Sequence, residues 1–434
     1  MDDSGSETVT TAEATPSQVV RMLGGLLDDG HLAGVEQLPG LVAEHAARAG
    51  VEQVVIYLAD LREQVLRELT GRGLNAADGG GQLSVDGSLP GRVFRHSRSA
   101  TSAGSRAGLI RYWMPILDGT QRLGVLGAEA ARGAEETLRY LAAMVALHLV
   151  SKSPFSDSHA RLVRTSPMNV AAEMQWGLIP PRSFANEQVA IAAAMEPAYA
   201  VGGDSFDFAI AGDTTHLAVF DAMGHDSTAG LTANLAVATC RNERRQGAGL
   251  VPTSESIERS LIDHFGHSRY VTAILADLDT ATGQLAWVNR GHHPPVLIRA
   301  SRWGATLECP PAHPMGIEAS LPVRLCREQL QPGDRLLLYT DGVTEARDAE
   351  GREFGLERFT DFIVRSNADG LPVPETLRRL MNAILDYHDG QLRDDATVLF
   401  CEWRGPVRNQ RLADEQPNRA SRSRSHPTGH RGSR

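Results

Sequence analysis

The pattern of apolar and polar positions predicts a first folded region in the N-terminal third of the chain. Apolar residues at helical spacing predict helices near residues 19–27, 41–49, 91–95 and 137–150. Short β-branched or aromatic runs predict strands at residues 54–58, 65–69, 112–117 and 123–127. Asp118 and Gly119 separate the last two runs, which is typical of a hairpin turn. We therefore expect one α+β domain over residues 16–150.

The C-terminal half alternates runs of strands with pairs of helices. Strands are expected at residues 189–195, 206–210, 217–220, 271–278, 284–289, 295–298, 335–339 and 396–403. Helices are expected at residues 228–245, 255–265, 356–364 and 376–387. This order predicts two antiparallel sheets that pack face to face, with helices outside them, so the fold class of the whole chain is α+β.

The remaining segments are expected to connect or flank these two regions. A connecting helix is predicted with Ala171, Met174 and Leu178 on one face, beginning with Ser166 and Pro167 as its N-cap and first residue. Both ends lack apolar periodicity and are predicted to be disordered. The expected division is a disordered segment 1–15, a domain 16–150, a linker 151–187, a domain 188–403 and an Arg-rich tail 404–434.

Charge and cysteine usage narrow the function classes. The formal net charge of −10 argues against nucleic-acid binding by the whole chain, although residues 404–434 carry eight arginines and only two acidic residues. The acidic N-terminus does not resemble a signal peptide, and no apolar run reaches the ~18 residues of a membrane span. The four cysteines lie far apart without metal-type spacing, so we expect no disulfide framework and a cytoplasmic location.

Four acidic motifs in the C-terminal half lie at predicted strand ends. They contain Asp204, Asp221, Asp341 and Asp394. Any one of them alone is more typical of a simple turn, but together they favour convergence at one end of a sandwich. Converging carboxylates repel one another unless cations neutralise them, and hard divalent ions such as Mg²⁺ or Mn²⁺ prefer such oxygen ligands. His225 is a candidate general acid, and an equally good candidate for a packed or turn-capping residue.

The same motifs carry a family resemblance over about residues 168–403. They are Gly202-Gly-Asp-Ser-Phe-Asp207, Asp221-Ala-Met-Gly-His225, Val288-Asn-Arg-Gly-His-His-Pro-Pro295, Pro314-Met-Gly-Ile317, the run from Pro332 to Ala346, and Asp394-Asp-Ala-Thr-Val398. In this order they closely resemble the SpoIIE-type serine/threonine phosphatases, the bacterial branch of the metal-dependent protein phosphatases. The resemblance implies an αββα sandwich, and the segment 172–181 resembles the family's switch-helix lead-in.

The resemblance also implies a site and a reaction. Asp204 and Asp221, with the carbonyl of Ala222, would hold two Mn²⁺ or Mg²⁺ ions, and Asp341 and Asp394 would complete one side. These four aspartates are the predicted catalytic residues, while Asp207 and Asp395 are outer-shell or third-metal candidates. The implied reaction is hydrolysis of phosphoserine or phosphothreonine by in-line attack of a metal-bridging hydroxide, without a phosphoenzyme.

Two positions depart from the family pattern. Asp226 stands where the family usually has Gly, and His293 stands where Pro is common. Neither departure removes a carboxylate of the implied metal shell. Asp226 adds negative charge near the metals, and this bears on substrate preference and metal affinity.

Residues 35–150 resemble a GAF-type sensory domain through Gly91-Arg-Val-Phe-Arg95 and the run from Trp113 to Leu126. Its ligand stays open. No Cys precedes Cys240, and this excludes a thioether-linked bilin. Haem bound through His45, His96 or His148 is one alternative, and ordinary solvated or core roles for these histidines are another. A third alternative is an empty pocket in a domain that serves only dimerisation.

Three functions remain to be compared. The first is a phosphatase that acts on a regulatory phosphoprotein, and an anti-sigma-factor antagonist is the expected partner. The N-terminal domain would regulate this enzyme. The enzyme would form a homodimer through that domain and the linker helix. The second is a catalytically weak docking module with a phosphatase fold. The third is nucleic-acid contact by the Arg-rich tail, against which a solvated tail is the simpler interpretation.

Overall fold

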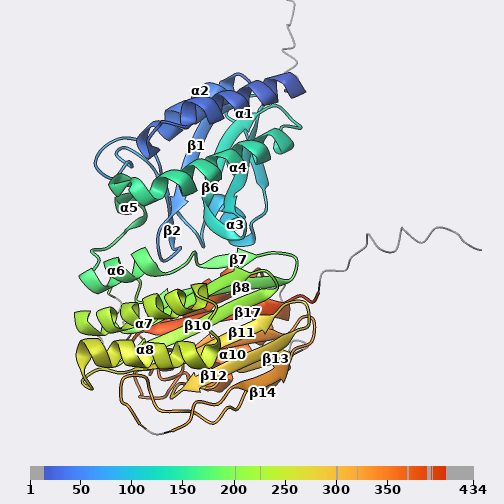
Figure 1. Ribbon diagram of the computed structural model, residues 1–434. Helices are drawn as coiled ribbons and strands as arrows, with labels where there is room; N and C mark the ends of the chain where they lie inside the picture. The colour runs from blue at the N-terminus through green and yellow to red at the C-terminus, as the bar shows by residue number, and fades with distance from the viewer. Residues whose placement is uncertain are drawn as a thin grey trace, which may run out of the picture.

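The computed structural model describes residues 14–200, 202–224, 226–299, 302–319, 321–368, 371–388, 392 and 394–406. Predictions for residues 1–13, for His225 and for the tail beyond residue 406 lie outside this range. The N-terminal half and the C-terminal half stack one on the other, and the segment containing α5 and α6 runs between them (Figure 1). No helix within the described part of the chain is long and apolar enough to cross a membrane.

The N-terminal half is built on a six-stranded antiparallel sheet in the order β3-β2-β1-β6-β5-β4. Its strands are β1 (Glu52–Ala59), β2 (Val65–Glu68), β3 (Gln82–Ser84), β4 (Ala100–Ala103), β5 (Ile110–Asp118) and β6 (Gln121–Ala130). The predicted hairpin is confirmed, because Asp118 pairs with Gln121 across the turn. The short strands β3 and β4 were not predicted; their polar or small residues carry no apolar alternation, and each lies at an edge of the sheet.

Helices cover both faces of this sheet. One face packs against α1 (Pro16–Gly30), α2 (Leu38–Ala47) and α4 (Glu135–Lys152), and the other packs against α3 (Leu89–His96). Two of the haem-candidate histidines have packing roles between these helices. His45 is fully buried with its Nε2 2.9 Å from Asp29 Oδ2, and the buried His148 of α4 hydrogen-bonds the backbone of Leu26.

The C-terminal half contains the predicted pair of antiparallel sheets. One sheet has the order β15-β12-β11-β10-β9 and the other has the order β14-β13-β16-β17-β8-β7. The first contains β9 (Asp204–Ala211), β10 (Thr214–Ala222), β11 (Val271–Asp279), β12 (Gln284–Arg290) and β15 (Cys326–Gln329). The second contains β7 (Ser183–Ala185), β8 (Val189–Glu196), β13 (Val296–Arg299), β14 (Arg302–Thr306), β16 (Arg335–Tyr339) and β17 (Ala396–Trp403).

Three apolar layers show that this half is a four-layer αββα sandwich. Side chains from both sheets, such as Phe206 and Leu399, form the central layer. The helices α7 (Ser227–Arg245) and α8 (Leu250–Phe265) pack on the outside of the first sheet (Figure 1). The helices α10 (Gly355–Ala368) and α11 (Val373–Tyr387) pack on the outside of the second. The predicted arrangement of sheets and helices is therefore confirmed.

The segment between the halves differs in detail from the prediction. It contains a 3-10 helix (Ser153–Phe155), α5 (Asp157–Val163) and α6 (Val170–Leu178), and a further 3-10 helix (Val35–Gln37) precedes α2. The predicted start at Ser166 and Pro167 is wrong, because Asn169 is the N-cap of α6 and accepts a 2.7 Å hydrogen bond from the Ala172 N–H. An Asn side chain at this position satisfies a free N–H of the first turn, so the helix begins there.

Two cysteines that lie 17 residues apart are paired. Cys309 and Cys326 form a disulfide across the connection that leads into β15, whereas Cys240 and Cys401 are free and buried. The sequence spacing did not indicate this pair, because 17 residues match neither a C-x-x-C pair nor a metal-type spacing.

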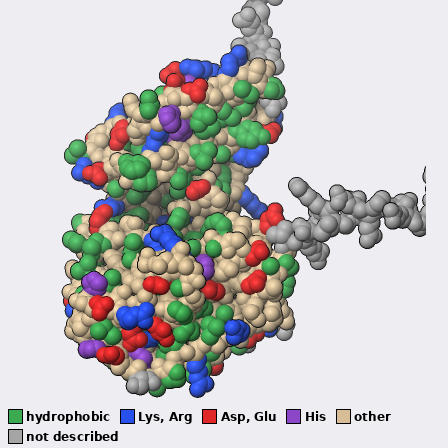
Figure 2. Space-filling view, viewed as in Figure 1, with side chains coloured by type: hydrophobic (Ala, Val, Ile, Leu, Met, Phe, Trp, Pro, Cys, Tyr) green, Lys and Arg blue, Asp and Glu red, His purple; other side chains and the backbone are tan. Residues whose placement is uncertain are grey.

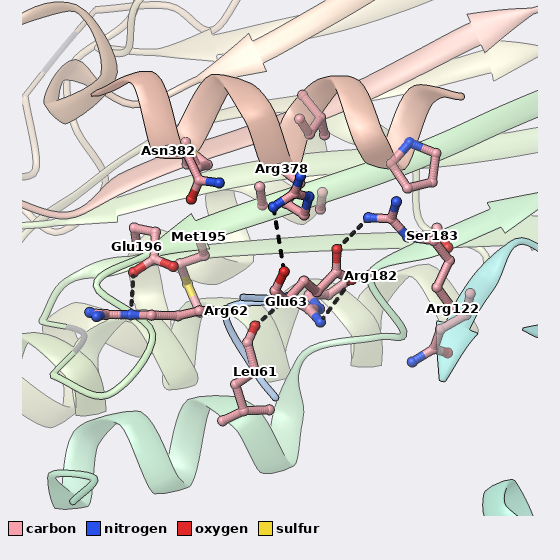
Figure 3. Close-up of a pocket in the computed structure, with 16 residues that line it drawn as sticks. Leu61, Arg62, Glu63, Arg122, Arg182, Ser183, Met195, Glu196, Arg378 and Asn382 are labelled. Atoms are coloured by element: carbon pink, nitrogen blue, oxygen red, sulfur yellow. Dashed lines mark hydrogen bonds and ion pairs between the residues drawn. The ribbon is translucent and has the colours of Figure 1, made fainter. Parts of the chain in front are cut away.

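The two halves meet through an ionic network. Arg122 of β6 donates to the fully buried Glu375 of α11 at 3.0 Å and also pairs with Glu63 in the β1–β2 turn. Arg378 of α11 holds Glu375 at 2.9 Å and reaches Asp86 of the N-terminal half at 2.7 Å. Figure 3 shows the pocket beside this network, which is lined by both halves. Because Arg122, Arg378 and Glu375 are buried and mutually paired, removal of one of them would leave an uncompensated buried charge at this junction.

Candidate metal centre

Two of the predicted metal ligands face each other on neighbouring strands. Asp204 begins β9 and Asp221 lies near the end of β10, and the two residues are directly paired in the antiparallel register. Directly opposed residues have side chains on the same face of the sheet, with Cβ atoms roughly 5 Å apart. The strand register therefore places these two carboxylates together.

Gly203 allows the loop before β9 to pass close to the end of β10. A Cβ atom on Gly203 would lie 2.3 Å from the carbonyl oxygen of Ala222, and the Ala222 N–H donates to the Gly203 carbonyl at 3.0 Å. The Ala222 carbonyl thus lies against the residue that precedes Asp204. This position agrees with its predicted contribution of a backbone oxygen.

The other two predicted ligands come from the second sheet. Asp341 begins the short helix α9 (Asp341–Thr344) directly after β16, and Asp394 lies just before β17, the strand next to β16. The backbone of Gly342 packs closely on this second segment, since a Cβ atom there would lie 2.0 Å from the Asp395 carbonyl oxygen. The two acidic segments of this sheet are therefore adjacent.

A hydrogen-bonded link joins the two sheets at this end of the sandwich. The Thr340 hydroxyl donates to Asp204 Oδ2 at 2.5 Å and accepts from the Thr397 N–H at 2.9 Å. All of these residues are buried. Thr340 therefore positions one carboxylate of the first sheet from the second sheet.

Asp395 organises the loop that carries Asp204. Its Oδ2 accepts hydrogen bonds from the N–H groups of Gly202, Gly203 and Asp204 at 2.7, 2.7 and 3.2 Å. This arrangement supports an outer-shell role for Asp395 among the two alternatives that the sequence left open.

Asp207 does not fit either of its predicted roles. Both of its carboxylate oxygens are bound by arginines of α7, with Arg241 and Arg244 at 2.7 Å. Residues three apart on a strand point to opposite faces, so Asp207 faces the helices while Asp204 lies on the side of Asp221.

Electrostatic effects among the carboxylates are strong. Burial, as the largest cause, and the charges of Asp341, Asp394 and Asp395 together raise the pKa of Asp221 to about 7. Burial and the charges of Asp221 and Asp395 also raise the pKa of Asp204 well above its usual value. Burial is likewise the main cause of the raised pKa of Asp341. Carboxylates that oppose one another's ionisation in this way fit a site for cations.

Of the two departures from the family pattern, the one at Asp226, between β10 and α7, has a structural explanation. Asp226 is the N-cap of α7, accepts from the Ala229 N–H at 2.8 Å, and lies 3.5 Å from Arg269. These partners lower its pKa, with the hydrogen bond from Ala229 as the largest cause. The charge of Asp226 is therefore compensated locally.

The connecting helix contacts this centre through a residue that the sequence did not single out. Gln175 of α6 is fully buried, and its Nε2 donates to the Asp204 carbonyl at 2.6 Å. The neighbouring Trp176 donates from Nε1 to the Ala198 carbonyl at 2.7 Å. The helical period places the polar Gln175 on the same face as Ala171 and Ala172, and this was the available signal.

A cavity of about 220 Å³ opens beside the second-sheet ligands. Its lining contains Asp341, Gly342, Glu345, Ala346, Arg347, His388, Leu392 and Asp394. Among the pockets described, this one has two of the predicted metal ligands in its wall, whereas the pocket of Figure 3 lies at the junction of the halves. A substrate group that reaches Asp341 and Asp394 has space to enter here.

Comparison with known proteins supports this interpretation of the C-terminal half. The family model "Stage II sporulation protein E (SpoIIE)" matches residues 211–404, which include Asp221, Asp341 and Asp394, while Asp204 lies just before the matched segment. The chain is 22% identical to the phosphoserine phosphatase RsbU of Bacillus subtilis over 237 residues, or 54% of this chain and 69% of RsbU. It is 26% identical to the phosphoserine phosphatase RsbP of the same organism over 37% of this chain and 41% of RsbP.

A solved structure of the RsbU and RsbW domains of a Mycobacterium tuberculosis protein aligns with 51% of this chain and 63% of that chain. The sequence identity is 26% and the TM-score is 0.46. The GAF-like assignment of the N-terminal half stays a prediction. The predicted resemblance of the C-terminal half to the SpoIIE-type phosphatases is confirmed over residues 211–404.

Proposed function

We propose that this chain is a metal-dependent protein phosphatase that hydrolyses phosphoserine or phosphothreonine on a regulatory protein. The observation that carries the proposal is the meeting of Asp204 and Asp221 from one sheet with Asp341 and Asp394 from the other. Both relatives described above carry the name phosphoserine phosphatase, which supports the same reaction for this chain.

The residues fit a pair of Mn²⁺ or Mg²⁺ ions. The donor set consists of carboxylates and the Ala222 carbonyl, which are the hard oxygen ligands that these ions prefer. The raised pKa of Asp221 means that the site is electrostatically incomplete without cations. Asp204, Asp221, Asp341, Asp394 and the Ala222 carbonyl would hold the two ions.

The bound ions would neutralise the phosphoryl oxygens and activate the attacking water. The side chains around the site position Asp204 for this reaction. Thr340 fixes one oxygen of Asp204, Asp395 fixes the loop before it, and Gln175 fixes its carbonyl. Because these groups are buried and hydrogen-bonded, the Asp204 carboxylate is held in place before substrate arrives.

The partner that we propose is a phosphorylated anti-sigma-factor antagonist, as the family resemblance implies. The N-terminal half would regulate the enzyme through α6, which contacts the metal centre by Gln175. Exposed apolar side chains on two neighbouring helices support homodimerisation of that half. They are Val20 and Leu27 of α1 and Tyr140, Leu147 and Val150 of α4. Such surfaces commonly mark protein contacts.

The alternative of a docking module with weak catalysis rested on the altered run at Asp226. Since Asp226 caps α7 and pairs with Arg269, its charge does not argue against metal binding. The phosphatase is therefore the function that we favour.

The test is turnover of p-nitrophenyl phosphate and of a phosphoserine protein by the full chain with Mn²⁺. Asp221→Asn and Asp341→Asn are expected to lower kcat by about 100-fold or more, since each removes charge from the centre that stabilises the transition state. Asp213→Asn is the matched control, because this exposed residue lies at the opposite end of the same β9–β10 hairpin. Wild-type turnover in both site variants would contradict the proposal.

A further inference from the structure

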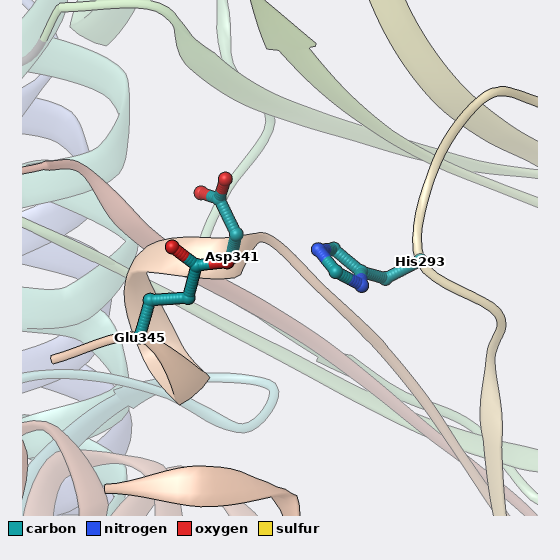
Figure 4. Close-up of side chains that lie close together, drawn as sticks. All are labelled: His293, Asp341 and Glu345. Atoms are coloured by element: carbon teal, nitrogen blue, oxygen red, sulfur yellow. The ribbon is translucent and has the colours of Figure 1, made fainter. Parts of the chain in front are cut away.

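A histidine and two acidic side chains meet at the outer edge of the proposed metal centre. The ligand atoms of His293, Asp341 and Glu345 all lie within 4.8 Å of one another. His293 lies in the loop between β12 and β13, Asp341 begins α9, and Glu345 directly follows α9. Figure 4 shows the imidazole of His293 on the side of Asp341, the first residue of α9, and of Glu345, which follows this helix.

The backbone places the two carboxylates on one side of the α9 turn. Asp341 and Glu345 are four residues apart, and the Glu345 N–H donates to the Asp341 carbonyl at 2.7 Å. Residues four apart in a helical turn project from the same face.

Aromatic packing holds His293 in place from the other side. Its ring stacks on Tyr339 with the ring centres 5.8 Å apart and the planes 21° apart. Tyr339 is the last residue of β16, two positions before Asp341, so the same strand positions both the imidazole and the carboxylate.

The loop that carries His293 is itself fixed by its neighbour. His292 is buried, its Nε2–H donates to the Tyr339 carbonyl at 2.9 Å, and the Thr272 hydroxyl donates to its Nδ1 at 2.7 Å. The backbone of His292 makes two further 2.8 Å hydrogen bonds with the Asn289 side chain. The exposed His293 ring is therefore presented on a rigid loop.

The spacing suits a metal ion after a small closure. Ligand atoms that share a Zn²⁺ ion at about 2.0–2.2 Å lie roughly 3–4 Å apart, and those of the three side chains already lie within 4.8 Å. Three protein ligands leave further positions for water or substrate oxygens, and the cavity beside Asp341 and Glu345 provides the space for them.

We propose that His293, Asp341 and Glu345 form a further metal site, which takes a first-row transition ion such as Zn²⁺, Co²⁺ or Mn²⁺ in preference to Mg²⁺. An imidazole nitrogen is a ligand that these ions accept readily, whereas Mg²⁺ selects oxygen. This further site depends on the proposed function in one respect, because it shares Asp341 with the proposed two-ion centre.

The proposal is tested by measuring the binding of Zn²⁺ and Co²⁺ to the metal-stripped full chain. Mg²⁺ is present in large excess to fill the sites that have only oxygen ligands. The wild type is expected to bind one more equivalent of Zn²⁺ than His293→Ala or His293→Gln. Glu345→Gln is expected to weaken the same equivalent by at least about tenfold, because even indirect partners of a metal contribute that much. The visible absorption of bound Co²⁺ should change in the His293 variants.

His267→Ala is the matched control, since His267 is also exposed beside a carboxylate, with its Nε2 3.4 Å from Glu318. This variant should bind metal like the wild type. Equal Zn²⁺ stoichiometry and identical Co²⁺ spectra in the wild type and in both His293 variants would overturn the proposal. A His293-dependent Zn²⁺ equivalent in a chain that hydrolyses no phosphate ester would support the site while rejecting the proposed function.

Discussion

Replacing Asp221 by Asn is expected to stabilise the metal-free protein while removing its activity. In the absence of cations, burial and the charges of Asp341, Asp394 and Asp395 raise the pKa of Asp221 from 3.8 to about 7. Asn has nearly the shape of the protonated carboxyl group but cannot ionise. The substitution therefore removes an unfavourable charge from a buried site.

The sign and size of the effect follow from the shifted pKa. A carboxyl group whose pKa is raised by folding binds its proton more tightly in the folded state than in the unfolded state. Its favourable contribution is complete below pH 3.8 and is lost as the pH rises through about 7. A shift of about three units at ~1.36 kcal/mol each corresponds to about 4 kcal/mol of unfolding free energy, so at pH 8 the metal-free Asp221→Asn protein should be more stable by up to that amount.

Urea denaturation in the presence of a chelator, at pH 5 and at pH 8, measures this difference. The wild type should lose stability between the two pH values, and Asp221→Asn should lose markedly less. Addition of Mn²⁺ should stabilise the wild type at pH 8 and have a weaker effect on the variant, because ligand binding to the folded state adds to its stability. Equal stability of the two metal-free proteins at pH 8 would refute the electrostatic reasoning.

Three further predictions concern the supports of the site and the junction of the halves. Glu375→Gln leaves Arg122 and Arg378 without their shared carboxylate and should lower the unfolding free energy by about 3–5 kcal/mol, measured by denaturation at neutral pH. Gly203→Ala forces a Cβ atom against the Ala222 carbonyl and should weaken Mn²⁺ binding in calorimetry; unchanged affinity would contradict the close approach. Gln175→Ala removes the hydrogen bond to the Asp204 carbonyl and should weaken Mn²⁺ binding by about tenfold, with an unaltered affinity speaking against coupling through α6.

The sequence predicts the long elements well because their apolar patterns reflect burial on one or two faces. Strand β10 and helix α7, for example, lie where the pattern placed them. The short elements β3, β4 and α9 contain too few apolar residues to produce a period, and only the finished sheet or loop defines them. Local capping also decides helix ends, as Asn169 does for α6.

The sequence predicted which acidic residues belong to the candidate site, whereas the role of each residue could be assigned only from the strand register. Asp204 and Asp207 are equivalent in a list of acidic motifs, yet they lie on opposite faces of β9, and only Asp204 lies on the side of the proposed metal centre. The meeting of His293 with Glu345 depends on a loop and a helix that are 52 residues apart in sequence, and no local pattern indicates such a contact.

The pairing of β8 with β17 also determines how the C-terminal half can fold. Val189 pairs with Trp403 and Glu196 pairs with Ala396, so the first long strand of this half and its last strand are neighbours in the middle of a sheet. Such non-local pairing must close a loop of about 200 residues, which slows folding relative to a fold built from local contacts. During synthesis, the second sheet therefore stays incomplete until residue 403 has left the ribosome, and the loop carrying Asp204 lacks its Asp395 support until then.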